Sequence, residues 1–300
     1  MPSPLVASPF PMDTPDRISS PEEIAEFFGG VLDYSRLGQD ALVVQAKQRL
    51  LRNKAFSVVN FPAQKSDYAN FCSMFGELLP TYREQVEGDV FGIGDVAFKP
   101  SVESGERFAT ERLGPLPFHT SRSWSMQRPQ FFSMLMKSTG PLGNPVGQNG
   151  ESMLLRSSDA LRDMQQCHPE RYKEDLAVLM QTAVRFRADH LLEDPDTYPL
   201  LFPLEDGMDE YDYGMRFKNN LVNILKSSRE EIAAADRFFE VLDGFESVLL
   251  TTDRSLVFQM APGQLTFFDN NRVAHGRRPF TPIETDVNLP PRHLFNAQVL

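Results

Sequence analysis

The sequence predicts an α+β fold in which β-rich regions alternate with helical ones. Short apolar runs broken by Gly and Pro fill residues 90–132, and further β-rich runs lie at 55–61 and 255–268. Amphipathic stretches with helical spacing separate these regions. Because no internal repeat or break in composition divides the chain, we expect one domain over residues 21–300, with a helical insertion at 157–244.

Local signals predict the first elements. Residues 1–20 are rich in proline and lack the basic and apolar order of an export signal, so we expect a flexible arm. A serine followed by proline and two acids predicts a helix from Pro21. Helical character continues over 40–53, a strand is expected at 55–61, and an amphipathic helix at 67–79.

The later elements are predicted in the same way. Residues 170–192 present one apolar face and predict a helix, and Ser228 opens another with the spacing of a capping box. Near the C-terminus, residues 255–260 and 265–268 predict two strands, with a Pro-Gly turn at 261–264 between them.

Charge and composition indicate a small-molecule partner. A net charge of −11, with a pI near 5.0 and no run of Lys or Arg, argues against binding to nucleic acid or acidic lipid. No stretch of 18 apolar residues is present, so we expect no membrane span and a cytoplasmic protein. Cys72 and Cys167 form neither a disulfide framework nor a thiolate zinc motif, and we expect both to be buried, reduced thiols.

The five histidines are the candidate metal ligands. None of them forms the H-x-x-x-H pair of a helix-borne zinc site, and His168 and His190 lie in polar stretches typical of a surface. His119 and His275 differ because each ends an apolar run next to a turn. Two imidazoles from distant β segments can bind iron, although such a pair is more often structural.

Four segments together carry a family resemblance. The most specific is 262–280, with the sequence Pro-Gly-Gln-Leu-Thr-Phe-Phe-Asp-Asn-Asn-Arg-Val-Ala-His-Gly-Arg-Arg-Pro-Phe, and the second is 114–124, which contains Pro-Phe-His-Thr-Ser. Residues 150–154 and 292–294 complete the set. Across residues 55–296 the chain resembles the iron(II)- and 2-oxoglutarate-dependent oxygenases of the taurine dioxygenase and clavaminate synthase type.

The resemblance implies a double-stranded β-helix, a jelly-roll-like core of two sheets with flanking and inserted helices. It implies that His119 and His275 bind Fe(II), and that 2-oxoglutarate and O2 are co-substrates. By position, Ser152 takes the role of the hydroxyl residue that contacts 2-oxoglutarate. The enzyme would then be an oxidoreductase acting on a small molecule.

The far carboxylate of 2-oxoglutarate needs a buried cation, and a guanidinium can donate two parallel hydrogen bonds to it. The resemblance assigns this role to Arg292. Arg277 and Arg278 are alternative candidates for this role because both closely follow His275. The alternative without a functional role is that each forms an ion pair with a surface acid.

Ser121 departs from the family pattern, which has Asp or Glu two residues after the first histidine. A hydroxyl is neutral and a poor ligand for a hard cation, so one coordination position is left for another ligand. Glu111, Glu151 and Asp269 are nearby acids, but we expect Asp269 to accept hydrogen bonds from the turn or an arginine instead.

Three functions follow from Ser121. With water or another acid in the open position, the enzyme hydroxylates or desaturates an unactivated carbon of a small, specialised metabolite, and we favour this interpretation. With chloride or bromide there, it is a halogenase. With weak metal binding or none, it is a ligand-binding or non-redox protein, although keeping His119, His275 and Arg292 together argues against that outcome.

Overall fold

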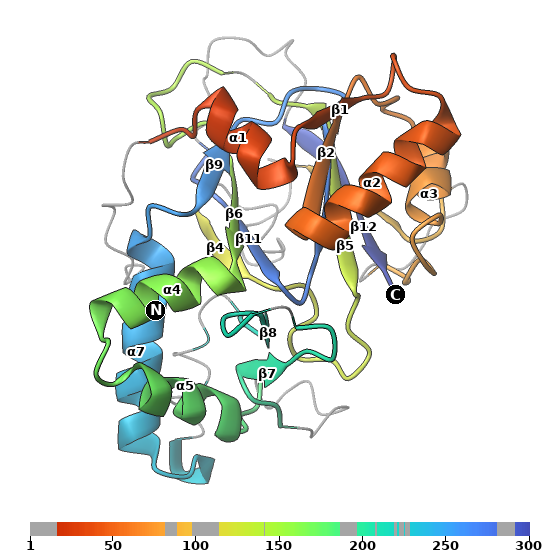
Figure 1. The fold of residues 1–300 in the computed structure, drawn as a ribbon. Coiled ribbons are helices and arrows are strands. Elements are labelled where there is room, and N and C mark those ends of the chain that lie inside the picture. Colours follow the sequence, from red (N-terminus) through yellow and green to blue (C-terminus); the bar gives the residue numbers. More distant parts are fainter. Residues whose placement is uncertain are drawn as a thin grey trace, which may run out of the picture.

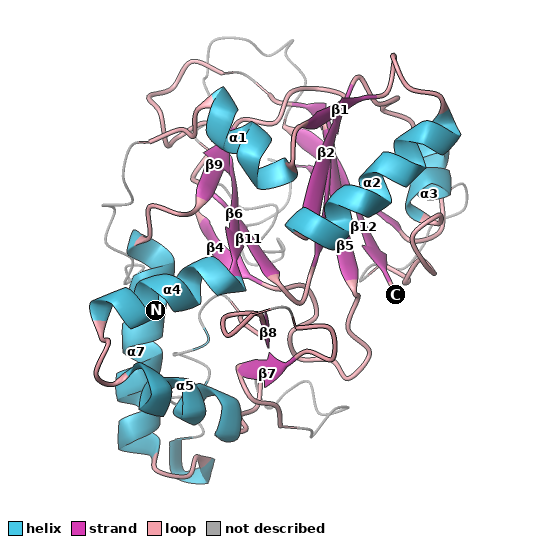
Figure 2. Cartoon of the chain, viewed as in Figure 1, coloured by secondary structure: helices cyan, strands magenta, loops and turns pink. Residues whose placement is uncertain are grey.

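The computed structural model describes residues 17–81, 89–97, 114–140, 142–186, 197–207, 209–218, 221, 225, 229–280 and 292–300. Within these residues, two sheets face each other and helices cover their outer sides (Figure 2). This confirms the α+β class and the jelly-roll-like core.

The large sheet has six strands in spatial order: β1 (Val31–Asp33), β2 (Ala55–Val59), β10 (Leu265–Asp269), β5 (Phe131–Ser138), β12 (His293–Val299) and β3 (Ile93–Ala97). Only the β1–β2 pair is parallel. The small sheet is antiparallel and has the order β4 (Leu116–His119), β11 (Val273–Arg277), β6 (Ser152–Arg156) and β9 (Leu256–Phe258).

Helices gather on the two outer faces (Figure 1). The large sheet is covered by α2 (Gln39–Asn53) and α3 (Lys65–Cys72), and α1 (Pro21–Phe28) packs at the end of both sheets. On the side of the small sheet, α4 (Ser157–Cys167) packs on β6, α7 (Ala235–Thr251) packs against α4, and α5 (Tyr172–Gln181) packs against α7. A third core, between the sheets, contains the inward side chains of both, among them Phe132, Leu154 and Phe268.

Local signals account for several element boundaries. Helix α1 begins as predicted, because Ser20 and Glu23 form a complete capping box in front of and within its first turn. The last residues of the predicted arm pack on the fold. The Ser19 amide donates to the Val257 carbonyl over 2.8 Å, so this segment lies along the edge of β9. Residues 1–16 lie outside the described residues.

Some predicted boundaries are wrong. The helix expected at 67–79 ends at Cys72, and the helix expected at 170–192 ends at Gln181, with residues 187–196 outside the described part. Ser228 is also outside it, and the helix expected there is a short 3-10 turn at Arg229–Glu231 before α7 begins. In the first two cases the apolar pattern continues past the helix because the following loop still packs apolar side chains into the core, among them Leu79, Val184 and Phe186.

Two further differences concern the turn at 261–264 and the insertion. The turn forms, with the Gln264 amide donating to the Ala261 carbonyl over 2.9 Å, but it joins β9 and β10, which belong to different sheets. The insertion at 157–244 also contains a two-stranded hairpin, β7 (Leu201–Pro203) and β8 (Tyr213–Met215). Cys72 is buried as expected, whereas Cys167 is exposed.

Candidate metal and co-substrate site

His119 and His275 lie directly opposite each other on the paired strands β4 and β11. Their ring centroids are 4.2 Å apart, and the ring planes meet at 45°. The register shifts between His275 and Arg277, so β4 contains a bulge immediately before His119. Two residues far apart in the sequence are therefore direct neighbours, and a sheet ladder fixes their separation.

The surroundings of the two rings suit metal ligands. The His119 Nδ1 lies 2.9 Å from the Pro117 carbonyl, to which it can donate, which would leave the other ring nitrogen as a lone-pair donor. His275 stacks on Phe132 with centroids 4.4 Å apart, and its buried Nδ1 has no hydrogen-bond partner in the described part of the chain. An unpartnered buried nitrogen is costly unless a ligand satisfies it.

Burial favours the neutral form of both imidazoles. Burial lowers the pKa of His275 well below its usual value, and the neighbouring His119 lowers it further. The pKa of His119 is also lowered by burial, although backbone hydrogen bonds oppose the shift. Neutral imidazole is the form that binds a metal ion, so the pair fits a divalent cation.

Ser121 follows the strand that carries His119. It is buried, and its peptide group is held by the side chain of Asn270, which lies in the turn between β10 and β11. Ser121 therefore lies beside β4 and β11, the strands that carry the two histidines. Its backbone is fixed by hydrogen bonds and is not exposed to solvent.

The candidate acids are engaged elsewhere. Both carboxylate oxygens of Glu151 accept backbone amides of the preceding loop, from Gly147 and Asn149. Asp269 accepts from the Arg272 guanidinium over 2.8 Å, as expected from the sequence. No group of three or more His, Cys, Asp and Glu that could hold a metal occurs among the described residues, and Glu111 lies outside them.

Ser152 and Arg277 are cross-strand partners at the start of β6 and the end of β11, two pairs along from His275 and Leu154. Side chains alternate along a strand, so Arg277 points to the same side of the sheet as His275. Arg277 is buried, donates to the Gly114 carbonyl over 2.9 Å, and has its pKa lowered to about 10 by burial.

Arg292 enters the same region from the start of β12. Its backbone and side chain lie against Gly140 and Gly150, where an added Cβ would come within 2.8 Å of the Arg292 amide nitrogen and 3.2 Å of its Nε. Burial, together with the charge of Arg277, lowers the pKa of Arg292 to about 9. No carboxylate of the described residues pairs with Arg292, so two neighbouring buried cations suit an anionic ligand.

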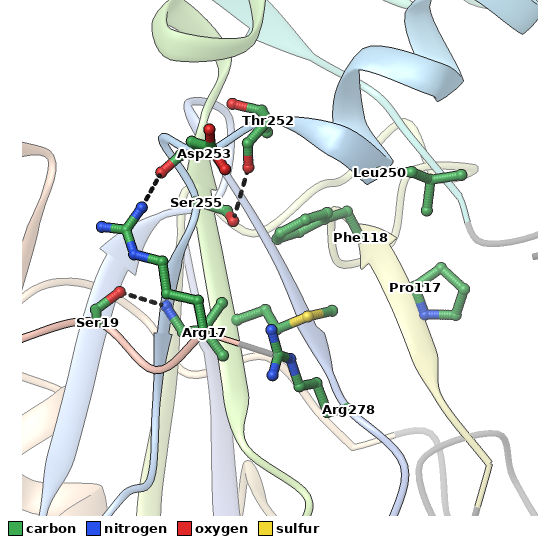
Figure 3. Close-up of a pocket in the computed structure, with 11 residues that line it drawn as sticks. Arg17, Ser19, Pro117, Phe118, Leu250, Thr252, Asp253, Ser255 and Arg278 are labelled. Carbon is green, nitrogen blue, oxygen red and sulfur yellow. Dashed lines mark hydrogen bonds between the residues drawn. The ribbon is translucent and has the colours of Figure 1, made fainter. Parts of the chain in front are cut away.

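Arg278 is buried as well. Neither Arg278 nor Arg277 is therefore a surface residue, as the alternative of an ion pair with a surface acid would require. It faces a cavity of about 40 Å³ together with Phe118, Arg17 and Ser19 (Figure 3). Phe118 belongs to the core beneath the helices, on the face of the small sheet opposite His275. This cavity is therefore separate from the paired histidines, and the Arg17 and Ser19 groups in it are bonded to Glu23, Asp253 and Val257.

Two of the remaining three histidines lie among the described residues. His168 is exposed, as predicted, and His190 is outside the described residues. His293 contacts Asp95 through a 2.7 Å pair between the Nε2 and the carboxylate. Sequence reasoning missed Asn270 and the two glycines that border Arg292, for which the only sequence signals are an Asn at a turn and glycines in a Gly-rich loop.

Comparison with known proteins identifies the family. Residues 21–298 match the family described as "Taurine catabolism dioxygenase TauD, TfdA family". No match was found among curated proteins. Among the described residues, no helix is long and apolar enough to cross a membrane.

Solved structures share the fold at low identity. The non-heme iron oxygenase OrfP, in complex with Fe and alpha-ketoglutaric acid, has a TM-score of 0.60 and 15% identity and covers 96% of this chain and 94% of its own. An asparagine oxygenase in complex with Fe(II), 2S,3S-3-hydroxyasparagine and succinate has a TM-score of 0.56 and 17% identity, covering 87% and 79%. The PvcB protein from Pseudomonas aeruginosa has a TM-score of 0.57 and 15% identity, covering 89% and 82%.

These matches agree with the two-sheet core. The family match extends over nearly the whole described fold. The chain belongs to the taurine catabolism dioxygenase TauD, TfdA family and is an Fe(II)- and 2-oxoglutarate-dependent dioxygenase.

Proposed function

We propose that this enzyme hydroxylates or desaturates an unactivated carbon of a small, specialised metabolite, with His119 and His275 as the protein ligands of iron. The observation that carries the proposal is their direct pairing across β4 and β11, with ring centroids 4.2 Å apart. Iron(II), 2-oxoglutarate and O2 supply the oxidising chemistry when bound, and the protein supplies orientation and a dry site.

The two imidazoles would act as neutral ligands of fixed direction. The Pro117 carbonyl accepts from the His119 ring and holds its orientation, while Phe132 stacks on the ring of His275. Such neighbours typically change metal affinity about 10- to 100-fold when they are removed.

Arg292 would bind the far carboxylate of 2-oxoglutarate, with Arg277 beside it and Ser152 opposite. His275 and Arg277 are two residues apart on one strand, a separation of about 6.6 Å along the sheet, which suits a five-carbon dicarboxylate held at both ends. The two buried guanidinium groups, without a carboxylate of the described residues against Arg292, favour a dianionic ligand.

Ser121 would leave the third protein position of the metal to water or to another small ligand. Its neutral hydroxyl cannot supply the charge of the family's usual carboxylate. Glu151 and Asp269 are held by the loop amides and by Arg272, which supports a site with two histidines and no protein carboxylate.

Halide transfer is the second candidate, supported by that same engagement of Glu151 and Asp269 away from the site. A chloride ion would need a position free of carboxylate, and a serine side chain is small enough to admit it. Ligand binding without redox chemistry is the third outcome that the experiment must separate.

The test is aerobic incubation of the protein with Fe(II), 2-oxoglutarate and candidate substrates, with and without chloride. We expect succinate to form and the substrate to gain one oxygen or lose two hydrogens. Amino acids and sulfonates are the first compounds to test, because solved relatives carry the names asparagine oxygenase and taurine dioxygenase. A chlorinated product would select the halogenase, and no succinate with any substrate would contradict both enzymatic proposals.

A further inference from the structure

The side chain of Asn270 holds the peptide of Ser121 from both sides. Its Oδ1 accepts from the Ser121 amide over 2.7 Å, and its Nδ2 donates to the Ser121 carbonyl over 3.1 Å. Asn270 is 0% exposed, so neither bond competes with water. The side chain of Asn270 thus replaces the two backbone hydrogen bonds that a neighbouring antiparallel strand would make to Ser121.

Asn270 is itself fixed. Its Nδ2 also donates to the Pro129 carbonyl over 3.0 Å, and its backbone amide donates to the Gln130 carbonyl over 2.8 Å. The Arg128 guanidinium donates to the Met215 carbonyl over 2.9 Å nearby. The side-chain amide of Asn270 therefore makes three hydrogen bonds, which use both of its donors and fix a single orientation.

The residue before Ser121 is held by a different segment. The Thr120 amide donates to the Phe217 carbonyl over 2.8 Å, and the Phe217 amide donates to the Thr120 hydroxyl over 3.1 Å. Strand β4 ends at His119, and β11 begins only at Val273. Beyond the end of that ladder, Asn270 is what fixes the backbone at position 121.

We propose that Asn270 is a positioning residue for the metal site, which sets where the side chain at position 121 lies relative to His119 and His275. It acts through the backbone of Ser121 and does not touch the metal. This inference rests on the proposed function, because it takes position 121 to face the third coordination position. A carboxylate introduced at 121 would then reach the metal only while Asn270 holds the peptide.

The test is a double-mutant cycle of Ser121→Asp and Asn270→Ala, with the dissociation constant for Co(II) measured anaerobically from the visible absorption of the bound ion. Ser121→Asp should tighten Co(II) binding about 10- to 100-fold in the natural background. In the Asn270→Ala background the same change should gain less than about 3-fold. A smaller gain in Co(II) affinity in the Asn270→Ala background shows that positions 121 and 270 are energetically coupled. A loss of fold stability alone would not produce this difference between the two backgrounds.

Two results overturn the inference in distinguishable ways. An equal gain in both backgrounds shows that Asn270 does not position residue 121 and leaves the proposed function intact. No gain from Ser121→Asp even with Asn270 present shows that position 121 does not face the metal, which contradicts that part of the proposed function as well.

A matched control and a second variant separate positioning from folding. Gln264→Ala removes the side-chain amide at the other end of β10, where Gln264 bonds Ser57 and Ala261, and should leave the gain from Ser121→Asp unchanged. Asn270→Asp keeps the acceptor for the Ser121 amide and loses both donors. It should give an intermediate gain, and it replaces Asn270→Ala in the cycle if that variant does not fold.

Discussion

His119 and His275 are direct partners in the β4–β11 ladder, and their ring centroids lie 4.2 Å apart. Each backbone is held by sheet hydrogen bonds, so the separation of the two imidazoles is a property of the strand register. A slip of one residue would turn one ring to the other face of the sheet. The arrangement of the two imidazoles is therefore set by the fold itself.

His119→Gln should weaken Fe(II) binding by about 100-fold or more, since it removes one of only two proposed protein ligands. The fold should persist, because His119 is only half-buried. Isothermal titration with Fe(II) under anaerobic conditions measures the effect. His168→Gln, at an exposed position, is the control and should bind as the natural protein does. Unchanged affinity in His119→Gln would remove this residue from the metal site.

Arg292→Ala should raise the dissociation constant for 2-oxoglutarate about 10- to 150-fold, because hydrogen bonds to a charged group contribute about 1.5–3 kcal/mol. Metal affinity should not change. Titration of 2-oxoglutarate into the Fe(II) protein gives both values. Arg254→Ala, which removes a half-exposed arginine bonded to Asp163, is the matched control. If both variants bind 2-oxoglutarate equally well, the carboxylate is held elsewhere.

Gly140→Ala should destabilise the fold by about 1–3 kcal/mol and also weaken 2-oxoglutarate binding. Gly140 has a φ of +71°, and an added Cβ would lie 2.8 Å from the Arg292 amide nitrogen. Urea unfolding measures the free energy. Gly244→Ala within α7 is the control, because nothing lies within 4 Å of the added methyl, and it should stabilise the fold by about 1 kcal/mol. A Gly140→Ala protein as stable as the natural one would contradict the close approach.

Asp95 gives the fold a predictable response to acid. Burial raises its pKa, but hydrogen bonds from Lys65 and His293 outweigh burial and leave the pKa below its usual value. A carboxylate of this kind stabilises the fold above its unfolded pKa of about 3.9 and loses that contribution as pH falls through its folded pKa. Because the Asp95 side chain is 37% exposed, we expect at most about 1 kcal/mol.

The free energy of unfolding of Asp95→Asn, compared with the natural protein at several pH values, measures this contribution. The difference between them should be present near pH 6 and shrink below pH of about 4, as the carboxylate is protonated. A difference that is the same at every pH would show that the charge of Asp95 plays no part.

The α+β class and the start of α1 could be predicted because they leave local traces, whereas the pairing of His119 with His275 was implied by the family resemblance. The capping box at Ser20 and Glu23 predicts the start of α1, and the run from Pro262 to Phe280 predicts the strands around His275. Both depend on the order of neighbouring residues, which a sequence displays directly.

The rest depends on contacts between segments far apart. Nothing in the local sequence shows that Asn270 will bind the peptide of Ser121, or that β9 and β10 will enter different sheets after a turn that would suit a hairpin. Helix ends were predicted too late because loops that pack apolar side chains against the core continue the apolar pattern, as Phe75 and Leu78 do after Cys72. Arg277 and Arg292 were named from the sequence, but their burial side by side emerges only when β11 and β12 are in place.

The most direct test of a two-histidine iron site with a 2-oxoglutarate pocket is an anaerobic titration of the protein with Fe(II) and 2-oxoglutarate. We expect a weak visible charge-transfer band that saturates with one iron per chain, is lost in His119→Gln, and requires more 2-oxoglutarate in Arg292→Ala. No band at any concentration of iron, with the protein folded, would contradict this expectation.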